Sequence, residues 1–190
     1  MSVVVLPAAL TLAFFSREIL ELWIGDPDIV LNSYLLVSLL AIGNALNGLM
    51  HMPYALQLAN GWTRLAFYSN LFAVIVLVPA IIIATTHWGP TGAAGTWIIL
   101  NGGYLLVSVQ LMHYKLLKTE KWKWYIYDVG KPLLLVLAVV VTGRLLLSSD
   151  LPNYLTLTSL IVVFLLATVA AVSCSGFICR ALSKQFSWIR

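Results

Sequence analysis

The chain has 190 residues, of which 61% are hydrophobic and only 9% are charged, and its mean hydropathy is +0.96. A soluble domain carries about 25% charged residues and could not bury this much apolar surface in one core. The composition therefore excludes a disordered chain, a disulfide-rich secreted scaffold and a nucleic-acid-binding module. It predicts an all-α integral membrane protein. The net charge of +4 comes from basic residues between apolar segments, which is not the pattern of a polyanion-binding patch.

Apolar segments long enough to cross a bilayer recur along the whole chain. A spanning helix needs about 20 mostly apolar residues, and open strands would leave backbone groups unpaired in lipid. The first segment lacks a preceding basic region, so we interpret it as a span and not as a cleaved signal peptide. We expect one transmembrane domain over residues 1–190, with spans separated by Gly, Pro, Asn or Asp. The six expected spans are residues 3–24, 29–59, 65–86, 91–114, 132–148 and 155–181.

The distribution of the eleven Lys and Arg residues predicts the orientation of these spans. Arg17 and Arg144 fall on one side of the membrane, where Arg144 is expected to extend its side chain toward water. The other nine fall on the opposite side: Arg64, Lys115, Lys118, Lys121, Lys123, Lys131, Arg180, Lys184 and Arg190. The positive-inside rule makes this second side cytoplasmic. The start of the first span and the C-terminus are then cytoplasmic as well.

Residues 115–131 are expected to form a cytoplasmic loop in the membrane interface. Within it, the segment KWKWYIY (residues 121–127) alternates lysines with aromatic residues. Trp and Tyr favour the headgroup depth, and lysines extend toward water or meet anionic membrane lipids. The segment therefore indicates an anchor in the interface, with a specific lipid-headgroup site as the alternative.

Uncharged polar residues form a stripe on the second expected span. Their spacings of three and four residues place them within an arc of about 80° on a helix. The stripe consists of Asn44, Asn47, His51 and Tyr54. In hydrocarbon such residues either bond neighbouring helices or line a pathway. A single Asn is typical of helix packing, whereas a whole stripe favours a pathway. For His51, a hydrogen-bonding role and proton transfer both stay open.

Polar residues on the third and fourth expected spans extend this pattern. Trp97, Asn101, Tyr104 and Ser108 share one face of the fourth span, while Asn70 lies near the cytoplasmic end of the third. At the outer end of the first span, Arg17 has Glu21 four residues on, which favours a local ion pair. Attraction of an anionic substrate is the alternative for Arg17.

The residue types that carry enzymatic or metal chemistry are sparse. The three histidines, His51, His87 and His113, lie far apart in the sequence, and Cys174 and Cys179 are typical of helix packing. The chain also lacks a glycine-rich phosphate loop, a nucleophile elbow and a pair of intramembrane carboxylates. We therefore expect no enzyme activity, no metal and no cofactor.

Three segments resemble bacterial flippases for lipid-linked oligosaccharides. They are LNGLMHMPYALQLANGWTR (46–64), SREILELWIG (16–25) and GPTGAAGTW (89–97), the last leading to Asn101. These flippases export O-antigen and polysaccharide units and belong to the MATE-like multidrug/oligosaccharidyl-lipid/polysaccharide (MOP) transporter superfamily. The resemblance covers about residues 10–130 and is to the C-terminal part of the family. The last two spans match only as hydrophobic helices.

The resemblance implies a function and a set of partners. Family members have two lobes around a central cavity, and the six expected spans would make one lobe, needing an N-terminal lobe or a second copy as partner. The implied substrate is an undecaprenyl-diphosphate-linked oligosaccharide of the bacterial inner membrane, moved by alternating access. The polar residues of the second to fourth spans would line the cavity wall, with Arg64 and Lys115 attracting the diphosphate at the cytoplasmic mouth.

Other functions stay open on the sequence alone. A different exporter of the same superfamily, for drugs or other small solutes, would protect cells from cationic dyes. A non-transporting scaffold or remnant would tolerate alanine throughout the stripe. A membrane enzyme acting on polyprenyl lipids is least favoured, because its catalytic groups are missing.

Overall fold

The computed structural model describes residues 1–116, 121–147 and 152–174, and every regular element in this part is helical. Four of its helices are long and apolar enough to cross a membrane, or five if the bent pair α1 and α2 counts as one span. The expected all-α, membrane-embedded class is therefore confirmed for the described residues. The elements are α1 (Ser2–Phe14), α2 (Ser16–Trp23), α3 (Pro27–Ala59), α4 (Thr63–Gly103), η1 (Tyr104–Ser108), α5 (Val109–Leu116), α6 (Lys121–Lys123), η2 (Trp124–Gly130), α7 (Lys131–Leu146) and α8 (Asn153–Cys174).

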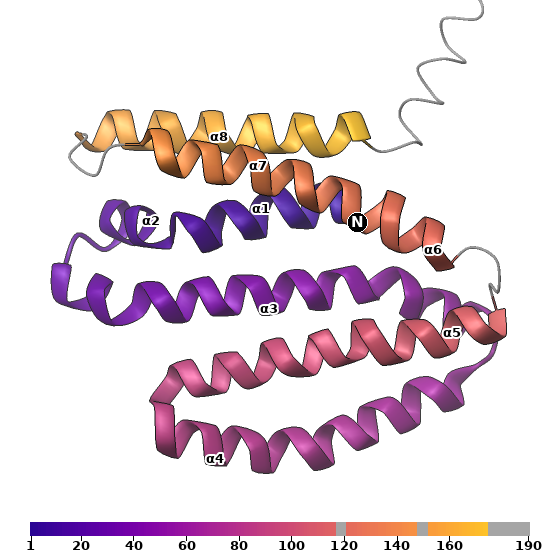
Figure 1. The fold of residues 1–190 in the computed structure, drawn as a ribbon. Helices are drawn as coiled ribbons and strands as arrows, with labels where there is room; N and C mark the ends of the chain where they lie inside the picture. Colours follow the sequence, from indigo (N-terminus) through magenta and orange to yellow (C-terminus); the bar gives the residue numbers. More distant parts are fainter. Residues whose placement is uncertain (117–120, 148–151, 175–190) are drawn as a thin grey trace, which may run out of the picture.

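The helices form a bundle in two connected halves (Figure 1). In one half, α1 packs against α7 and α8; in the other, α3 packs against α4, and α1 joins the halves by also contacting α3. The main hydrophobic cluster lies in the first half and consists of Leu10, Phe15, Val136, Val140, Leu160, Val163, Ala167 and Ala171. The α3–α4 half buries mostly alanines instead, such as Ala45 and Ala73. Polar side chains therefore carry more of the contacts there.

The first expected span, residues 3–24, is broken in the structure. The break lies at Phe15, and α2 turns away from α1 by 76°. Ser38 on α3 stabilises the break: its hydroxyl donates to the Ala13 carbonyl over 2.7 Å and lies 2.7 Å from the Ser16 hydroxyl. The residues at the break are neither Gly nor Pro, so the bend follows from packing and not from a local helix breaker.

Helix α4 consists of two helical arms that meet at Gly89. Gly89 has φ 62° and ψ −153°, a conformation outside the helical region that is essentially restricted to glycine. The chain reverses direction here, so the arms before and after Gly89 run antiparallel (Figure 1). Hydrogen bonds between Tyr104 and the Ser69–Asn70 pair join the arms far from the turn. The expected spans 65–86 and 91–114 correspond to these two arms.

The region expected as an interfacial loop, residues 115–131, is helical from Lys121 onward. Elements α6, η2 and α7 follow one another without a break, and Trp124–Leu146 is itself long and apolar enough to span. Residues 121–131 therefore have a helical conformation, while their expected position in the cytoplasmic interface stays a prediction. The end of the sixth expected span, residues 175–181, lies outside the described residues, as do Lys118, Cys179, Arg180, Lys184 and Arg190.

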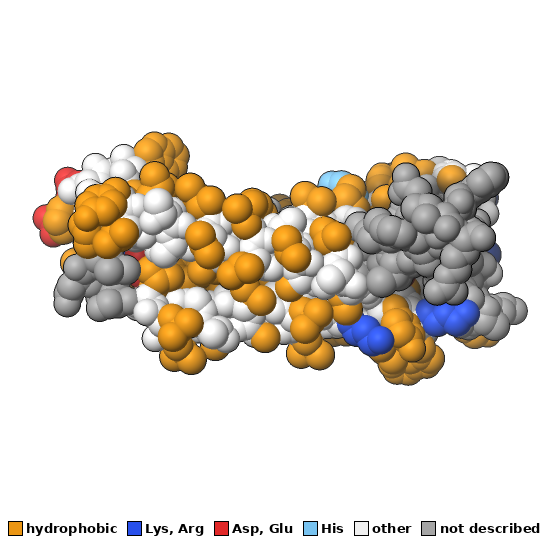
Figure 2. All heavy atoms as spheres, turned by 90° about the horizontal axis from the view of Figure 1, so that it is seen from above, with side chains coloured by type: hydrophobic (Ala, Val, Ile, Leu, Met, Phe, Trp, Pro, Cys, Tyr) orange, Lys and Arg blue, Asp and Glu red, His pale blue; other side chains and the backbone are white. Residues whose placement is uncertain are grey.

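Charged residues lie at the two ends of the bundle, with a hydrophobic body between them. On the face seen from above, the visible Asp and Glu side chains lie at one end of the molecule and the visible Lys and Arg side chains toward the other (Figure 2); Arg17 and Arg144 pair with the acidic residues. The acidic end holds Glu21, Asp26 and Asp28 around α2 and the start of α3, where Asp26 caps α3 by accepting from the backbone of Asp28 and Ile29. The basic end holds the start of α4 with Arg64, helix α5 with Lys115 and helix α6 with Lys123 (Figure 1). This separation suits a body that crosses a membrane between two aqueous phases.

Candidate functional site

A polar cavity of about 360 Å³ lies between α3, the first arm of α4 and η1. Six of the eight residues predicted to line a substrate cavity are in its wall. The lining residues are Asn47, Met50, His51, Tyr54, Gln57, Ala66, Ser69, Asn70, Tyr104 and Ser108. The cavity therefore joins residues that are up to 61 positions apart in the sequence, from Asn47 to Ser108.

The α3 wall follows directly from the helical spacing of its polar residues. Asn47, His51 and Tyr54 lie on consecutive turns, so their side chains share one face of the helix. His51 Nδ1 lies 3.1 Å from the Asn47 carbonyl, and when Nδ1 carries the proton, Nε2 is left as an acceptor. Tyr54 is 43% exposed, whereas Gln57, one turn further, is only 2% exposed. The wall thus offers an amide, an imidazole and a phenol.

The opposite wall is joined by hydrogen bonds between the first arm of α4 and η1. The Tyr104 hydroxyl lies 3.1 Å from Asn70 Oδ1 and 3.3 Å from the Ser69 carbonyl, either of which can accept its proton. The hydroxyls of Ser69 and Ser108 are 3.5 Å apart. Tyr104 and Ser108 are the first and last residues of the π-helical turn η1. Such turns widen a helix locally and are frequent at functional sites.

Two predicted cavity residues have a different role: they bond α3 to the second arm of α4. Asn101 is fully buried, accepts from Asn47 Nδ2 over 2.9 Å and donates to the Trp97 carbonyl over 2.8 Å. Asn44 Oδ1 accepts from Trp97 Nε1 over 3.3 Å. Neither Asn44 nor Asn101 lines the cavity. The predicted stripe is therefore divided into a helix-packing part, toward the bundle centre, and a cavity part toward the basic end.

Close approach of the two helices produces this division. A Cβ atom at Gly43 would lie 2.4 Å from Cδ1 of the Trp97 indole, so only glycine leaves room for that ring against α3. The Trp97 ring therefore occupies the space beside Asn44, a residue that we predicted from the sequence to line the cavity. The residues that line the cavity, toward the basic end, include no tryptophan, and the space between α3 and α4 stays open there.

The two basic residues predicted for the cytoplasmic mouth lie near the basic end of the bundle. Lys115 Nζ stands 4.2 Å from the centre of the Trp62 ring, a cation–π contact that leaves the ammonium charge available to solvent. Arg64 is exposed one residue into α4. Neither side chain lines the cavity itself.

Two ion pairs lie at the acidic end. Arg17 Nε donates to Glu21 Oε1 over 2.9 Å, which agrees with the expected local pair. Arg144 on α7 pairs with Glu18 on α2. The Arg144 side chain is 42% exposed in this pair, so the expectation that it extends toward water stays a prediction.

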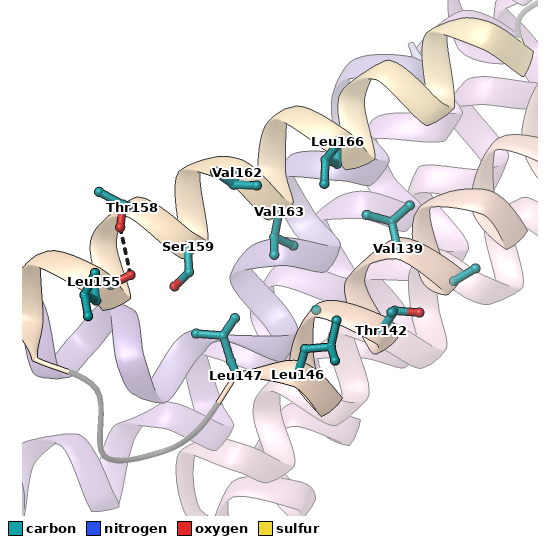
Figure 3. A pocket seen from close by; sticks show the side chains of 12 residues that line it. Val139, Thr142, Leu146, Leu147, Leu155, Thr158, Ser159, Val162, Val163 and Leu166 are labelled. Atoms are coloured by element: carbon teal, nitrogen blue, oxygen red, sulfur yellow. Dashed lines mark hydrogen bonds between the residues drawn. The ribbon is translucent and has the colours of Figure 1, made fainter.

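A second, larger cavity of about 750 Å³ lies between α7 and α8 (Figure 3). Its lining is apolar except for Thr142, Thr158 and Ser159. Thr158 donates to the Leu155 carbonyl and Ser159 to the Thr156 carbonyl, both within α8. This lining carries no charge, and two of its three hydroxyls are already bonded to backbone. The smaller cavity, where polar groups converge, is therefore the better candidate for recognition.

Sequence reasoning missed two polar residues of the candidate site, Gln57 and Ser69. Gln57 follows Tyr54 by three residues, so extending the stripe by one turn would have found it. Ser69 precedes the predicted Asn70, and only the packing of the second arm shows that both residues contact Tyr104. Within the described residues, no three His, Cys, Asp or Glu side chains are grouped to hold a metal ion.

Comparisons with protein-family models, with curated proteins and with solved structures gave no match to this chain. The site is therefore interpreted from its own chemistry.

Proposed function

We propose that the chain is one lobe of a flippase that moves an undecaprenyl-diphosphate-linked oligosaccharide across the bacterial inner membrane. The observation that carries this proposal is the cavity between α3, α4 and η1, whose polar lining is enclosed by apolar helices. Uncharged polar groups are costly in hydrocarbon, and a lining with several of them is typical of a pathway for a polar solute. The resemblance of residues 46–64 to oligosaccharide flippases points to the same class of substrate.

The chemistry of the lining favours a sugar over a cationic drug. Amide, imidazole, phenol and hydroxyl groups donate and accept hydrogen bonds, as the hydroxyls of a glycan do. The lining residues include no carboxylate that would balance a cation. An exporter of cationic drugs, the main alternative, therefore receives less support from this cavity.

The proposed mechanism is alternating access with a second lobe. This lobe and its partner, an N-terminal lobe or a second copy, would rock around the oligosaccharide and open first to one side of the membrane and then to the other. The basic end would face the cytoplasm by the positive-inside rule, with a cytoplasmic C-terminus. Arg64 and Lys115 at that end would attract the diphosphate through long-range electrostatics. The helix-packing pair Asn47–Asn101 would keep α3 and α4 moving as one body.

The test is transport by variants of the cavity. The full chain, with its partner lobe, is expressed in a strain whose oligosaccharide flippase is deleted, and surface polysaccharide is measured. We expect His51→Ala combined with Asn70→Ala to reduce surface polysaccharide at least tenfold, because two groups that bond the glycan are lost. The matched control is Thr142→Val with Thr158→Val, which removes two hydroxyls from the apolar α7–α8 cavity.

Three outcomes separate the candidate functions. Loss of polysaccharide in the cavity variant alone supports the flippase. Unchanged polysaccharide, with both variants folded and at equal abundance, refutes the cavity assignment and favours a scaffold. Loss of resistance to cationic dyes, without any effect on polysaccharide, refutes the oligosaccharide substrate in favour of a drug exporter.

A further inference from the structure

Tyr125 forms a hydrogen bond that connects the segment before α7 to the wall of the candidate cavity. Its hydroxyl donates to the Leu105 carbonyl over 2.7 Å, and the two residues are 20 positions apart. Leu105 lies in η1, directly after Tyr104, whereas Tyr125 belongs to η2. We propose that Tyr125 is a positioning residue that holds η1 in its π-helical register and thereby places Tyr104 and Ser108 in the cavity wall. Its relevance to transport rests on the proposed function.

The backbone of η1 explains why a donor is needed at this point. In an α-helix, the N–H of Val109 would bond to the Leu105 carbonyl four residues earlier. Here it bonds to the Tyr104 carbonyl, five residues earlier. The register shift removes from Leu105 the donor that an α-helix would give it. Because a backbone carbonyl without a donor is costly inside a bilayer, the Tyr125 hydroxyl stabilises the shifted register.

The shifted register lets the residues before η1 and the residues within it keep their hydrogen bonds to neighbouring helices. Before η1, Asn101 bonds to Asn47 on α3; within it, Tyr104 and Ser108 contact Ser69 and its neighbour on the first arm. If η1 returned to an α-helical register, its hydrogen-bonded turn would close after four residues instead of five. The helix on one side would then rotate by about 100° relative to the other. One of the two sets of contacts would be lost.

Tyr125 is itself held in place by its own helix and by packing. Its ring makes an edge-on contact with Trp124, with ring centres 5.0 Å apart. Gly130 lies beside it, and a Cβ there would stand 2.9 Å from the Tyr125 carbonyl. Four residues along, Val129 packs with Leu6 and Leu49, which join the α1 and α3 helices. The Tyr125 hydroxyl and the packing of Leu105 against this cluster therefore both connect η1 to the segment before α7.

The experiment measures the environment of residue 104 directly and independently of any substrate. The full chain, with 3-fluorotyrosine at position 104, is placed in nanodiscs and examined by fluorine NMR. We expect Tyr125→Phe to shift or split this resonance. The matched control is Tyr127→Phe, because Tyr127 is 54% exposed on the same segment and stacks with Lys131. This control should leave the resonance unchanged.

A second variant and a binding measurement complete the test. Gly130→Ala displaces Tyr125 without removing its hydroxyl, so it should move the resonance even if Tyr125→Phe fails to fold. Binding is measured with undecaprenyl diphosphate that carries one N-acetylglucosamine. Tyr125→Phe should weaken this binding about fivefold, the effect of losing one ordinary hydrogen bond.

The outcomes distinguish this inference from the proposed function. An unchanged resonance at residue 104 in folded Tyr125→Phe, or in Gly130→Ala where the former does not fold, overturns the positioning role. A fall in the unfolding midpoint with no change in the resonance also overturns it, because Tyr125 would then be only structural. A shifted resonance in a protein that does not bind the glycolipid probe supports the positioning role and refutes the proposed substrate.

Discussion

Replacement of Asn101 by alanine tests whether the predicted polar stripe really has two roles. The substitution removes the acceptor of the 2.9 Å bond from Asn47 Nδ2 and leaves that amide unpaired between α3 and α4. Hydrogen bonds between helices in membranes contribute about 0.6 kcal/mol on average, with a maximum near 1.7 kcal/mol. An unpaired buried polar group costs about 1–3 kcal/mol. Because Asn101 is fully buried, we expect a loss of about 1–3 kcal/mol in the free energy of unfolding.

His51→Ala is the matched comparison, since His51 lies on the same stripe but is exposed to the cavity and bonds only within its own helix. We expect it to change the free energy of unfolding by less than about 0.5 kcal/mol. The two single variants, Asn47→Ala and the double variant Asn47→Ala with Asn101→Ala are unfolded reversibly in mixed micelles, and unfolding is followed by circular dichroism. The cycle isolates the pairwise term. Equal destabilisation by Asn101→Ala and His51→Ala would refute the division of the stripe.

Two further predictions concern the turn in α4 and the acidic end. Gly89→Ala should lower the free energy of unfolding by about 1–3 kcal/mol, because its backbone conformation is essentially restricted to glycine. The control is Gly95→Ala, where a Cβ meets no atom within 4 Å. Equal effects of the two variants in thermal unfolding would contradict this reasoning. Arg144→Met should destabilise by about 1–3 kcal/mol, because the partly buried Glu18 carboxylate loses its cation. Adding Glu18→Gln should recover part of that loss, and a strictly additive double variant would show that the pair makes no contribution.

The positions of the helices were largely predictable from the sequence, because apolar runs and the Gly, Pro and Asn residues between them determine both length and ends. The break at Phe15 was not. Its neighbours favour a continuous helix, and the bend depends on Ser38 of α3, which is 25 residues from the Ala13 carbonyl that it bonds. The helix that begins at Lys121 was missed for a related reason: its lysines and aromatic residues suit an interfacial loop and the first turns of a span equally well.

The candidate site was predictable where one helix sets the geometry. The period of the α helix places Asn47, His51 and Tyr54 on one face, and the structure brings them together in the cavity. Which part of that face is open depends on a second helix. The Trp97 ring beside Gly43 closes one part, and the π-helical register of η1 shapes the other; neither has a signature that spacing in the sequence reveals.

The bend between α1 and α2 has a consequence for the surrounding lipid. Helix α2 turns away from α1 by 76° and carries three charged residues, Arg17, Glu18 and Glu21. A helix at this angle to a membrane-crossing α1 runs close to the plane of the bilayer surface, where charged side chains meet headgroups and water. The charges of α2 are then spread along the surface instead of being stacked along the depth of the bilayer.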